Sequence, residues 1–161
     1  MKQIKLRQGN FALIDDEDYE LIAKWKWWVD KDGYARRWTP QVKWKRTSIL
    51  MHREILGLGK QDQLFIDHIN RNKLDNRRLN LRIATKSQNA INKIKNKNNT
   101  SGFNGVVYHS AEKRIKRWRA QITINGKQKY LGRYLTKKEA FRARKEAELE
   151  YYGQFSRFYQ N

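Results

Sequence analysis

The chain has 161 residues and a mass of 19.5 kDa, the size of one domain or of two very small ones. Its 36 Lys and Arg exceed its 16 Asp and Glu by 20, and 39% hydrophobic residues exclude a disordered basic tail. The lack of cysteine excludes disulfide scaffolds and Cys-ligated zinc sites, and no apolar run is long enough to span a membrane.

This charge predicts a partner that is either a nucleic acid or an anionic membrane surface. We expect a soluble, cytoplasmic protein that binds nucleic acid and no membrane. No signal-peptide pattern follows Met1. Most of the excess lies between Asn76 and Lys138, where 17 Lys and Arg stand against Glu112 alone. These basic residues run through predicted loop, helix, linker and strand. That distribution favours a track along a phosphate backbone over one solvated helix face.

The apolar pattern of residues 1–56 predicts small sheets and two short helices. Residues 4–6 and 11–14 have the pattern of strands separated by turn residues. Asp15 or Asp16 can cap a helix that runs to about Lys24, with acids in its first turn. A hairpin-rich sheet is expected over residues 25–50, followed by a helix over 51–56. We interpret the tryptophans as core and rim packing, with base stacking by one of them as the alternative.

One stretch concentrates the groups that hydrolysis of a phosphate ester needs. A short strand over residues 64–66 delivers Asp67 and His68 together, and a second strand over 81–83 leads into a helix that carries Asn89. A carboxylate and an amide oxygen suit Mg²⁺ or Mn²⁺, and a neutral histidine can take a proton from an attacking water. On these residues alone, Asp67 and Asn89 are candidate metal ligands and His68 a candidate general base, while the alternative is that the Asp-His pair is structural and the asparagines are accidental in an Asn-rich chain.

The segment DHINRNKLDNRRLNLR, which begins at Asp67, resembles the HNH nuclease motif of the ββα-metal fold, in the branch found in phage and intron homing endonucleases. The likeness extends over about residues 50–92. It implies that His68 is the general base, that Asp67 binds the metal, and that the amide of Asn80 ties the loop and holds the histidine. Asn89 departs from the histidine that names the motif; asparagine there implies a metal ligand, as in the homing branch.

Three arginines, Arg77, Arg78 and Arg82, flank these residues. On a polar turn they could be solvated charges, but the planar guanidinium also suits a phosphate next to the scissile bond, and we favour phosphate contacts. His52 also matches the family and is expected to be structural or to contact phosphate. Without cysteine for structural zinc, the apolar N-terminal sheet is expected to brace the motif.

Residues 93–101 (KIKNKNNTS) have neither helical nor strand periodicity and are expected to form an extended basic linker. Its lysines Lys93, Lys95 and Lys97 are assigned to DNA binding. The linker separates a nuclease module over residues 1–92, with its motif at 64–92, from a second module over 102–161. There the pattern predicts three strands, joined in part by an Asn125-Gly126 hairpin, and a helix capped by Thr136.

This second module resembles the apetala-two/ethylene-response-factor type of DNA-binding domain, with RWRAQI, YLGRY, TKKEA and YYG in register. The resemblance covers about residues 101–155 and implies that one sheet face enters the major groove. It places these side chains against DNA: Val107, His109, Arg119, Gln121, Thr123, Gln128 and Tyr130. Val107 departs from the arginine usual in plant members, so a plant-type target sequence is not implied.

Together these patterns predict an α+β protein. An N-terminal ββα-metal HNH module, braced by a small antiparallel sheet, would be followed by the extended linker and by a three-stranded antiparallel sheet packed on one helix. The predicted function is a site-specific, metal-dependent DNA endonuclease of the homing type. It would act on double-stranded DNA as a monomer at an asymmetric site, and nick one strand per binding event in a bacterial or phage-infected cell.

Two alternatives from other classes remain. One is a non-catalytic, sequence-specific DNA-binding regulator with a decayed nuclease motif, and the other is an RNA-binding basic protein. The joint presence of Asp67, His68, Asn80 and Asn89 argues against decay, and an RNA-binding protein would explain the charge but not these four residues.

Overall fold

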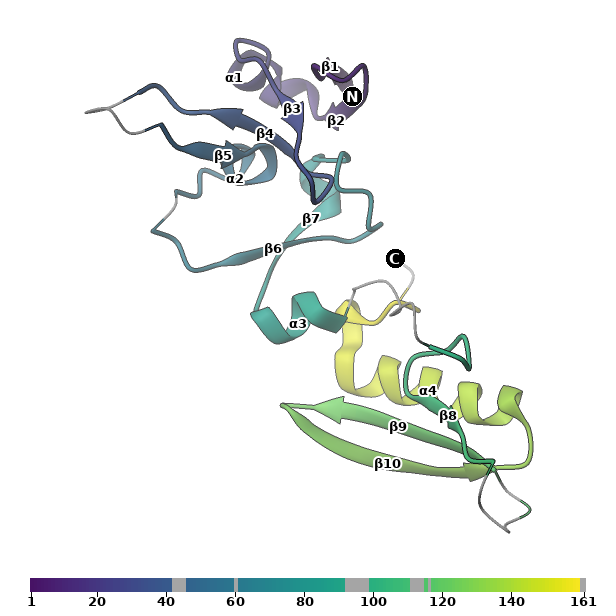
Figure 1. Cartoon of the computed structure of the whole chain (residues 1–161). Coiled ribbons are helices and arrows are strands. Elements are labelled where there is room, and N and C mark those ends of the chain that lie inside the picture. Colours follow the sequence, from purple (N-terminus) through teal and green to yellow (C-terminus); the bar gives the residue numbers. More distant parts are fainter. Residues whose placement is uncertain (42–45, 60, 92–98, 111–114, 116, 160–161) are drawn as a thin grey trace. The chain divides into compact units, whose positions relative to one another are not determined.

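The computed structural model describes residues 1–41, 46–59, 61–91, 99–110, 115 and 117–159. Contacts separate two compact units, Met1–Thr85 and Lys86–Asn161 (Figure 1). Most of the predicted linker, with Lys93, Lys95 and Lys97, lies outside the described residues. The predicted mixed α+β class with small antiparallel sheets is confirmed. None of the described helices is long and apolar enough to cross a membrane.

The first unit contains three small antiparallel sheets. Their strands are β1 (Lys2–Lys5) with β2 (Phe11–Ile14), then β3 (Trp28–Val29), β4 (Ala35–Trp38) and β5 (Ser48–Leu50), and finally β6 (Phe65–His68) with β7 (Leu81–Ala84). Buried side chains from the first two sheets and from β6 and β7 share one core. Trp27 is 1% exposed in that core, where its indole N–H donates to the carbonyl of Ile22 at 2.9 Å.

The helical segments of the first unit are short. The helix expected from residue 15 or 16 to about 24 is a 3₁₀ turn, η1 (Asp16–Asp18), followed by one turn of α-helix, α1 (Tyr19–Ile22). Asp15 makes no side-chain cap bond, because its Oδ2 accepts from the backbone N–H of Arg78 at 2.7 Å. The short helix expected after Leu50 is present as α2 (Met51–Ile55), and a 3₁₀ turn, η2 (Arg78–Asn80), precedes β7.

The second unit is a three-stranded antiparallel sheet with a long helix against it. The strands β8 (Val106–Tyr108), β9 (Trp118–Ile124) and β10 (Lys127–Tyr134) lie in the order β10-β9-β8. Asn125 and Gly126 both have positive φ, as a tight type I′ hairpin turn requires. The helices are α3 (Lys86–Ile91), α4 (Lys137–Tyr152) and the 3₁₀ turn η3 (Gly153–Phe155), and Thr136 and Glu139 form a capping box at the start of α4.

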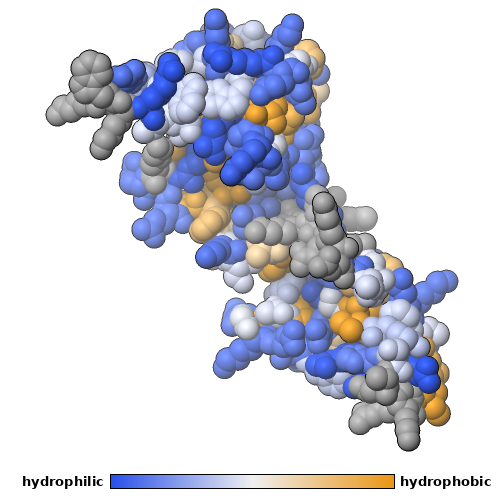
Figure 2. Space-filling model, viewed as in Figure 1, coloured by the Kyte–Doolittle hydropathy of each residue, from blue (hydrophilic) through white to orange (hydrophobic). Residues whose placement is uncertain are grey.

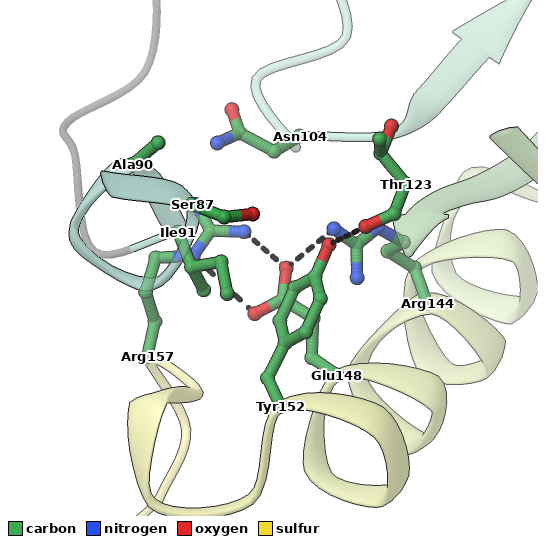
Figure 3. Close-up of a pocket in the computed structure, with 9 residues that line it drawn as sticks. All are labelled: Ser87, Ala90, Ile91, Asn104, Thr123, Arg144, Glu148, Tyr152 and Arg157. Atoms are coloured by element: carbon green, nitrogen blue, oxygen red, sulfur yellow. Dashed lines mark hydrogen bonds and ion pairs between the residues drawn. The ribbon is translucent and has the colours of Figure 1, made fainter. Parts of the chain in front are cut away.

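A buried carboxylate joins α4 to the segment that follows it. Glu148, 1% exposed, accepts from Arg144 at 3.0 Å and from Arg157, and the three side chains line a pocket of about 200 Å³ (Figure 3). Burial lowers the pKa of the Arg144 guanidinium, and the nearby carboxylate of Glu148 acts in the opposite direction by raising it. Beside them the Tyr152 hydroxyl donates to the carbonyl of Thr123 at 2.7 Å, which fixes the end of α4 against β9.

Two glycines of the second unit allow a matched test of this packing. Both Gly105 and Gly126 have positive φ, but a Cβ at Gly105 would clash with the Gln121 carbonyl and the Arg144 side chain, whereas one at Gly126 would meet open space. Gly126→Ala should therefore cost about 1–2 kcal/mol of backbone strain. Gly105→Ala should cost about 2–3 kcal/mol more, measured by urea unfolding followed by far-UV circular dichroism. Equal losses would contradict the close packing around Gly105.

Candidate active site

Asp67 and His68 stand at the end of β6, and both are buried, with 5% and 4% of their surfaces exposed. β6 pairs with β7 in a register that sets Asp67 opposite Arg82 and His68 opposite Leu81. The turn between the two strands, residues 69–80, therefore begins at the candidate base and ends at Asn80. The structure brings three of the predicted residues, Asp67, His68 and Asn80, to this one end of the β6–β7 hairpin.

Hydrogen bonds within the 69–80 turn fix its shape. The Asn80 side chain, 7% exposed, accepts from the backbone N–H of Asn70 at 2.9 Å and donates to the carbonyl of Asp75 at 2.7 Å. The Asn70 side chain in turn donates to the Asp75 carboxylate at 2.7 Å. Asn80 thus lies where an amide can tie the turn, the role that the motif implies for it.

The first sheet supports the same turn from outside. The backbone N–H of Leu13 on β2 donates to the carbonyl of Leu74 at 2.8 Å, and the N–H of Asn76 donates to the carbonyl of Leu13 at 2.8 Å. A short parallel β-bridge between Leu13 and Asp75 therefore joins β2 to the turn. Contacts of this kind can brace an HNH motif that has no cysteine for structural zinc.

Asn76 is a residue that the sequence reasoning missed. It is fully buried, and its Oδ1 lies 3.4 Å from Nε2 of His68. Its buried Nδ2 has no hydrogen-bond partner among the described residues. An amide so placed can orient the imidazole. The sequence offered only a weak signal, because the turn has four asparagines and nothing in the pattern says which one faces the histidine.

Two aromatic rings lie close to His68. The ring centroids of His52 and Tyr34 lie 5.1 Å and 5.9 Å from that of His68. Burial lowers the pKa of His68, while the Asn76 contact and the carboxylate of Asp67 oppose that shift. Burial and the neighbouring His68 and Arg53 lower the pKa of His52 to about 3. His68 is therefore favoured in its neutral form, the form that can accept a proton.

Each of the three flanking arginines has a carboxylate partner. Arg77 donates to Asp75 at 2.7 and 2.6 Å, and Arg78 to Asp18 at 3.1 and 2.6 Å. Arg82, whose side chain is 13% exposed, donates to Asp67 through Nε at 2.9 Å. These ion pairs give the arginines structural roles that the sequence did not reveal, and the expected phosphate contacts stay predictions.

The chemistry of Asp67 fits a divalent cation in part. Mg²⁺ commonly takes one or two protein carboxylates and completes its shell with water and substrate phosphate, and Asp67 offers such an oxygen beside His68. Arg82 engages the same carboxylate, and the described residues contain no group of three or more His, Cys, Asp or Glu that could hold a metal. Asn89 lies on α3, in the second unit, so its role as a ligand stays a prediction.

In the second unit the residues assigned to DNA share one sheet face. Ala120 and Ile122 are buried, and Arg119, Gln121 and Thr123 alternate with them on β9. The register sets Gln121 opposite Tyr130 and Thr123 opposite Gln128. These five side chains therefore lie together: Arg119, Gln121, Thr123, Gln128 and Tyr130. The Arg119 guanidinium lies 5.5 Å from the Tyr130 ring centroid, and Tyr130 is 54% exposed.

Three comparisons with known proteins bear on this site. A profile of the HNH endonuclease family matches residues 57–91. An uncharacterized HNH endonuclease, L560 of Acanthamoeba polyphaga mimivirus, is 35% identical over 95 residues, 56% of this chain and 48% of that protein. Protein 3.8 of Escherichia phage T7 is 39% identical over 95 residues, 58% of this chain and 74% of that protein.

A solved structure on DNA binding and cleavage by the HNH homing endonuclease I-HmuI is 30% identical to this chain, with a TM-score of 0.35. That match covers 41% of this chain and 39% of the other. The segment of this chain that matches the HNH endonuclease family contains Asp67, His68, Asn80 and Asn89. Particular relatives of the chain include phage T7 protein 3.8 and the mimivirus endonuclease. The chain matches most of the length of the T7 protein and about half of the length of the mimivirus protein.

The buried His52 predicts a pH dependence of stability. Its native pKa of about 3 lies below the ordinary value of 6.5, so between these values the unfolded chain binds a proton that the native state does not. Acidification from about pH 7 to about pH 5 should therefore lower the free energy of unfolding of the first unit by on the order of 2 kcal/mol. Urea unfolding at a series of pH values measures this fall.

His52→Gln removes one of the two buried histidines whose pKa is lowered, so it should make the pH profile shallower, and the control His109→Gln in the second unit should leave the profile as in the parent. An equally steep profile in His52→Gln would contradict the assignment of the effect to His52.

Proposed function

We propose that this protein is an HNH endonuclease that acts on double-stranded DNA as a site-specific, metal-dependent nickase of the homing type. The observation that carries the proposal is the burial of His68 beside Asp67 at the end of β6, inside the segment that matches the family. The net charge of +20 supports a polyanionic substrate. The viral origin of the two curated relatives supports a role in an infected cell.

In the proposed mechanism His68 takes a proton from a water molecule as the water oxygen attacks the scissile phosphorus. The bond from phosphorus to the 3′ oxygen breaks, this oxygen takes a proton from solvent, and the products are a 3′ hydroxyl and a 5′ phosphate. Asn76 and the rings of His52 and Tyr34 keep the imidazole oriented, and Asn80 keeps the turn closed. Asp67 and Asn89 would hold Mg²⁺ or Mn²⁺, which supplies charge stabilisation at the leaving oxygen when bound.

Arg82 has a proposed place in this mechanism. Its guanidinium faces the carboxylate of Asp67, so it stands next to the position where a phosphate would enter. A bound phosphate would offer this arginine a second anionic partner. Arg77 and Arg78 are proposed to reach the phosphates on either side. With one such site per chain, each binding event would cut one strand of an asymmetric site.

We further propose that the second unit selects the target sequence. Its exposed face carries guanidinium, amide, hydroxyl and phenol groups, the donors and acceptors that read base edges in the major groove. The expected likeness to the apetala-two type of domain supports this role, and the linker lysines would follow the backbone between the two units. A sequence-specific regulator without cleavage is the second candidate, favoured by the ion pair that engages Asp67.

Cleavage by the parent and by His68→Ala tests the catalytic proposal. The parent should nick supercoiled plasmid with Mg²⁺ or Mn²⁺, and a chelator should abolish the reaction. His68→Ala should lose at least about a hundredfold in rate, because a positioned general base contributes about 10²–10⁴. Its DNA affinity, measured by fluorescence anisotropy, should stay within about twofold, because the base acts on water and carries little of the binding energy.

A parent that nicks no plasmid with any divalent ion would favour the regulator. A His68→Ala variant that cuts as fast as the parent would overturn the assignment of the base.

Sequence selection is tested by Arg119→Ala and Gln121→Ala. Each should reduce discrimination between the target and other sequences by about 1–3 kcal/mol, if these side chains contact base edges. Binding to unrelated DNA should change less. The control Lys138→Ala, at an exposed position on α4, should not alter discrimination. Equal losses on all sequences for the two variants would make these residues phosphate contacts.

A further inference from the structure

The β3–β4–β5 sheet has one face that the catalytic proposal does not use. The register sets Trp28 opposite Arg36 and Trp38 opposite Ser48, and residues two apart on a strand share a face. These four side chains therefore form one surface, here called the outer face. Arg37, between Arg36 and Trp38, points the other way and is 8% exposed.

Two tryptophans on the outer face lie against each other instead of entering the core. The ring centroids of Trp28 and Trp38 are 5.0 Å apart with the planes tilted by 38°, and Trp38 is 44% exposed. The core already has its tryptophan in Trp27. A large aromatic ring left in water loses the free energy that burial would give, so the exposed Trp38, beside the half-buried Trp28, indicates a surface that a partner covers.

The outer face is held rigid before any partner arrives. The Arg36 guanidinium donates to Asp30 at 3.0 Å and to the Ser48 hydroxyl at 3.0 Å. Beyond Trp38, the backbone N–H of Thr39 donates to the carbonyl of Thr47 at 2.8 Å, and the two hydroxyls lie 2.8 Å apart. A fixed surface loses little conformational entropy when it binds.

Charge identifies the kind of partner. Residues 33–53 contain six Lys and Arg and no Asp or Glu, although two of the six, Arg36 and Arg37, pair with the flanking Asp30 and Glu54. The Arg46 guanidinium lies 5.6 Å from the ring centroid of Trp38, so the indole already accepts one flat cationic group. Figure 2 shows hydrophilic side chains over much of the visible surface of the first unit. Flat aromatic rings beside positive charge are the features that bind nucleotides by base stacking and phosphate contact.

We propose that the outer face binds unpaired nucleotides of the DNA substrate, with a base on Trp38 and a neighbouring phosphate at Arg46. In a duplex each base face is covered by the next base pair, so an exposed indole can stack only where a base is unpaired. The proposal rests on DNA as the substrate, and it adds a single-stranded segment to the double-stranded target. Trp28 supports the Trp38 ring from beside it.

Binding of a short fluorescein-labelled oligothymidine to the full chain tests the proposal. Trp38→Ala should weaken binding about tenfold, the usual loss when one stacking aromatic is removed. Trp38→Tyr, which keeps an aromatic face, should stay within about threefold of the parent. The control Phe11→Ala removes a ring that is 50% exposed on β2, outside the outer face, and should change nothing.

Three outcomes would overturn the proposal: unchanged binding in Trp38→Ala, an equal loss for Phe11→Ala, or an equal loss on a duplex of the same length. The third would make Trp38 a contact to the duplex backbone. Circular dichroism of each variant shows that it is folded. Plasmid nicking is measured separately. If the parent nicks DNA and Trp38→Ala binds oligothymidine as tightly as the parent does, the stacking proposal is refuted and the proposed nuclease function is not.

Photocrosslinking gives a readout that a change in folding would not produce. An oligonucleotide that carries iododeoxyuridine in place of thymidine should crosslink to Trp38 or to Trp28, located by mass spectrometry of the digested protein. Crosslinks confined to the second unit would overturn the assignment to the outer face.

Discussion

Pairing of guanidinium with carboxylate is the interaction on which the candidate active site depends. The 69–80 turn has few apolar side chains of its own, and the chain has no cysteine with which to staple it. Arg78 instead spans 60 residues to Asp18, which is 3% exposed, and Arg77 closes on Asp75, which is 1% exposed. Only the carboxylates of these pairs are buried, so loss of either arginine would leave a buried carboxylate without its guanidinium, and each pair therefore resists opening of the turn.

Local patterns in the sequence were enough to predict much of the α+β class and part of the site. A strand that ends in Asp67 and His68 is a short-range signal, and so are the Asn125-Gly126 turn and the Thr136 cap, because each depends on residues within one turn of the chain. The helix predicted from residue 15 or 16 is present only as a 3₁₀ turn and one α-helical turn, without a side-chain cap from Asp15, for the opposite reason. Its acids are used by partners far along the chain or at the N-terminus, Asp15 by Arg78 and Asp16 by the ammonium of Met1.

Long-range choices among equivalent residues could not be predicted. Four asparagines occupy the 69–80 turn, and only the fold shows that Asn76 faces His68 while Asn80 ties the backbone. The arginines are similar: a guanidinium beside a nuclease motif suits either a phosphate or a carboxylate, and the sequence does not reveal which acid folds back to it. Tyr34, in a strand hairpin, and His52, in a helix, contact His68 although they precede it by up to 34 residues. A local repeat in the sequence cannot predict contacts over such a separation.

The bridge from β2 to the turn has a consequence for how this protein can change over evolution. Leu13 acts on Leu74 and Asn76 through its peptide group alone, so the identity of its side chain hardly matters to those bonds. Almost any amino acid at position 13 should therefore keep these two backbone hydrogen bonds to the turn. Proline is the exception, because it has no N–H to give to Leu74. Position 13 should therefore tolerate many different residues in related proteins, but not proline.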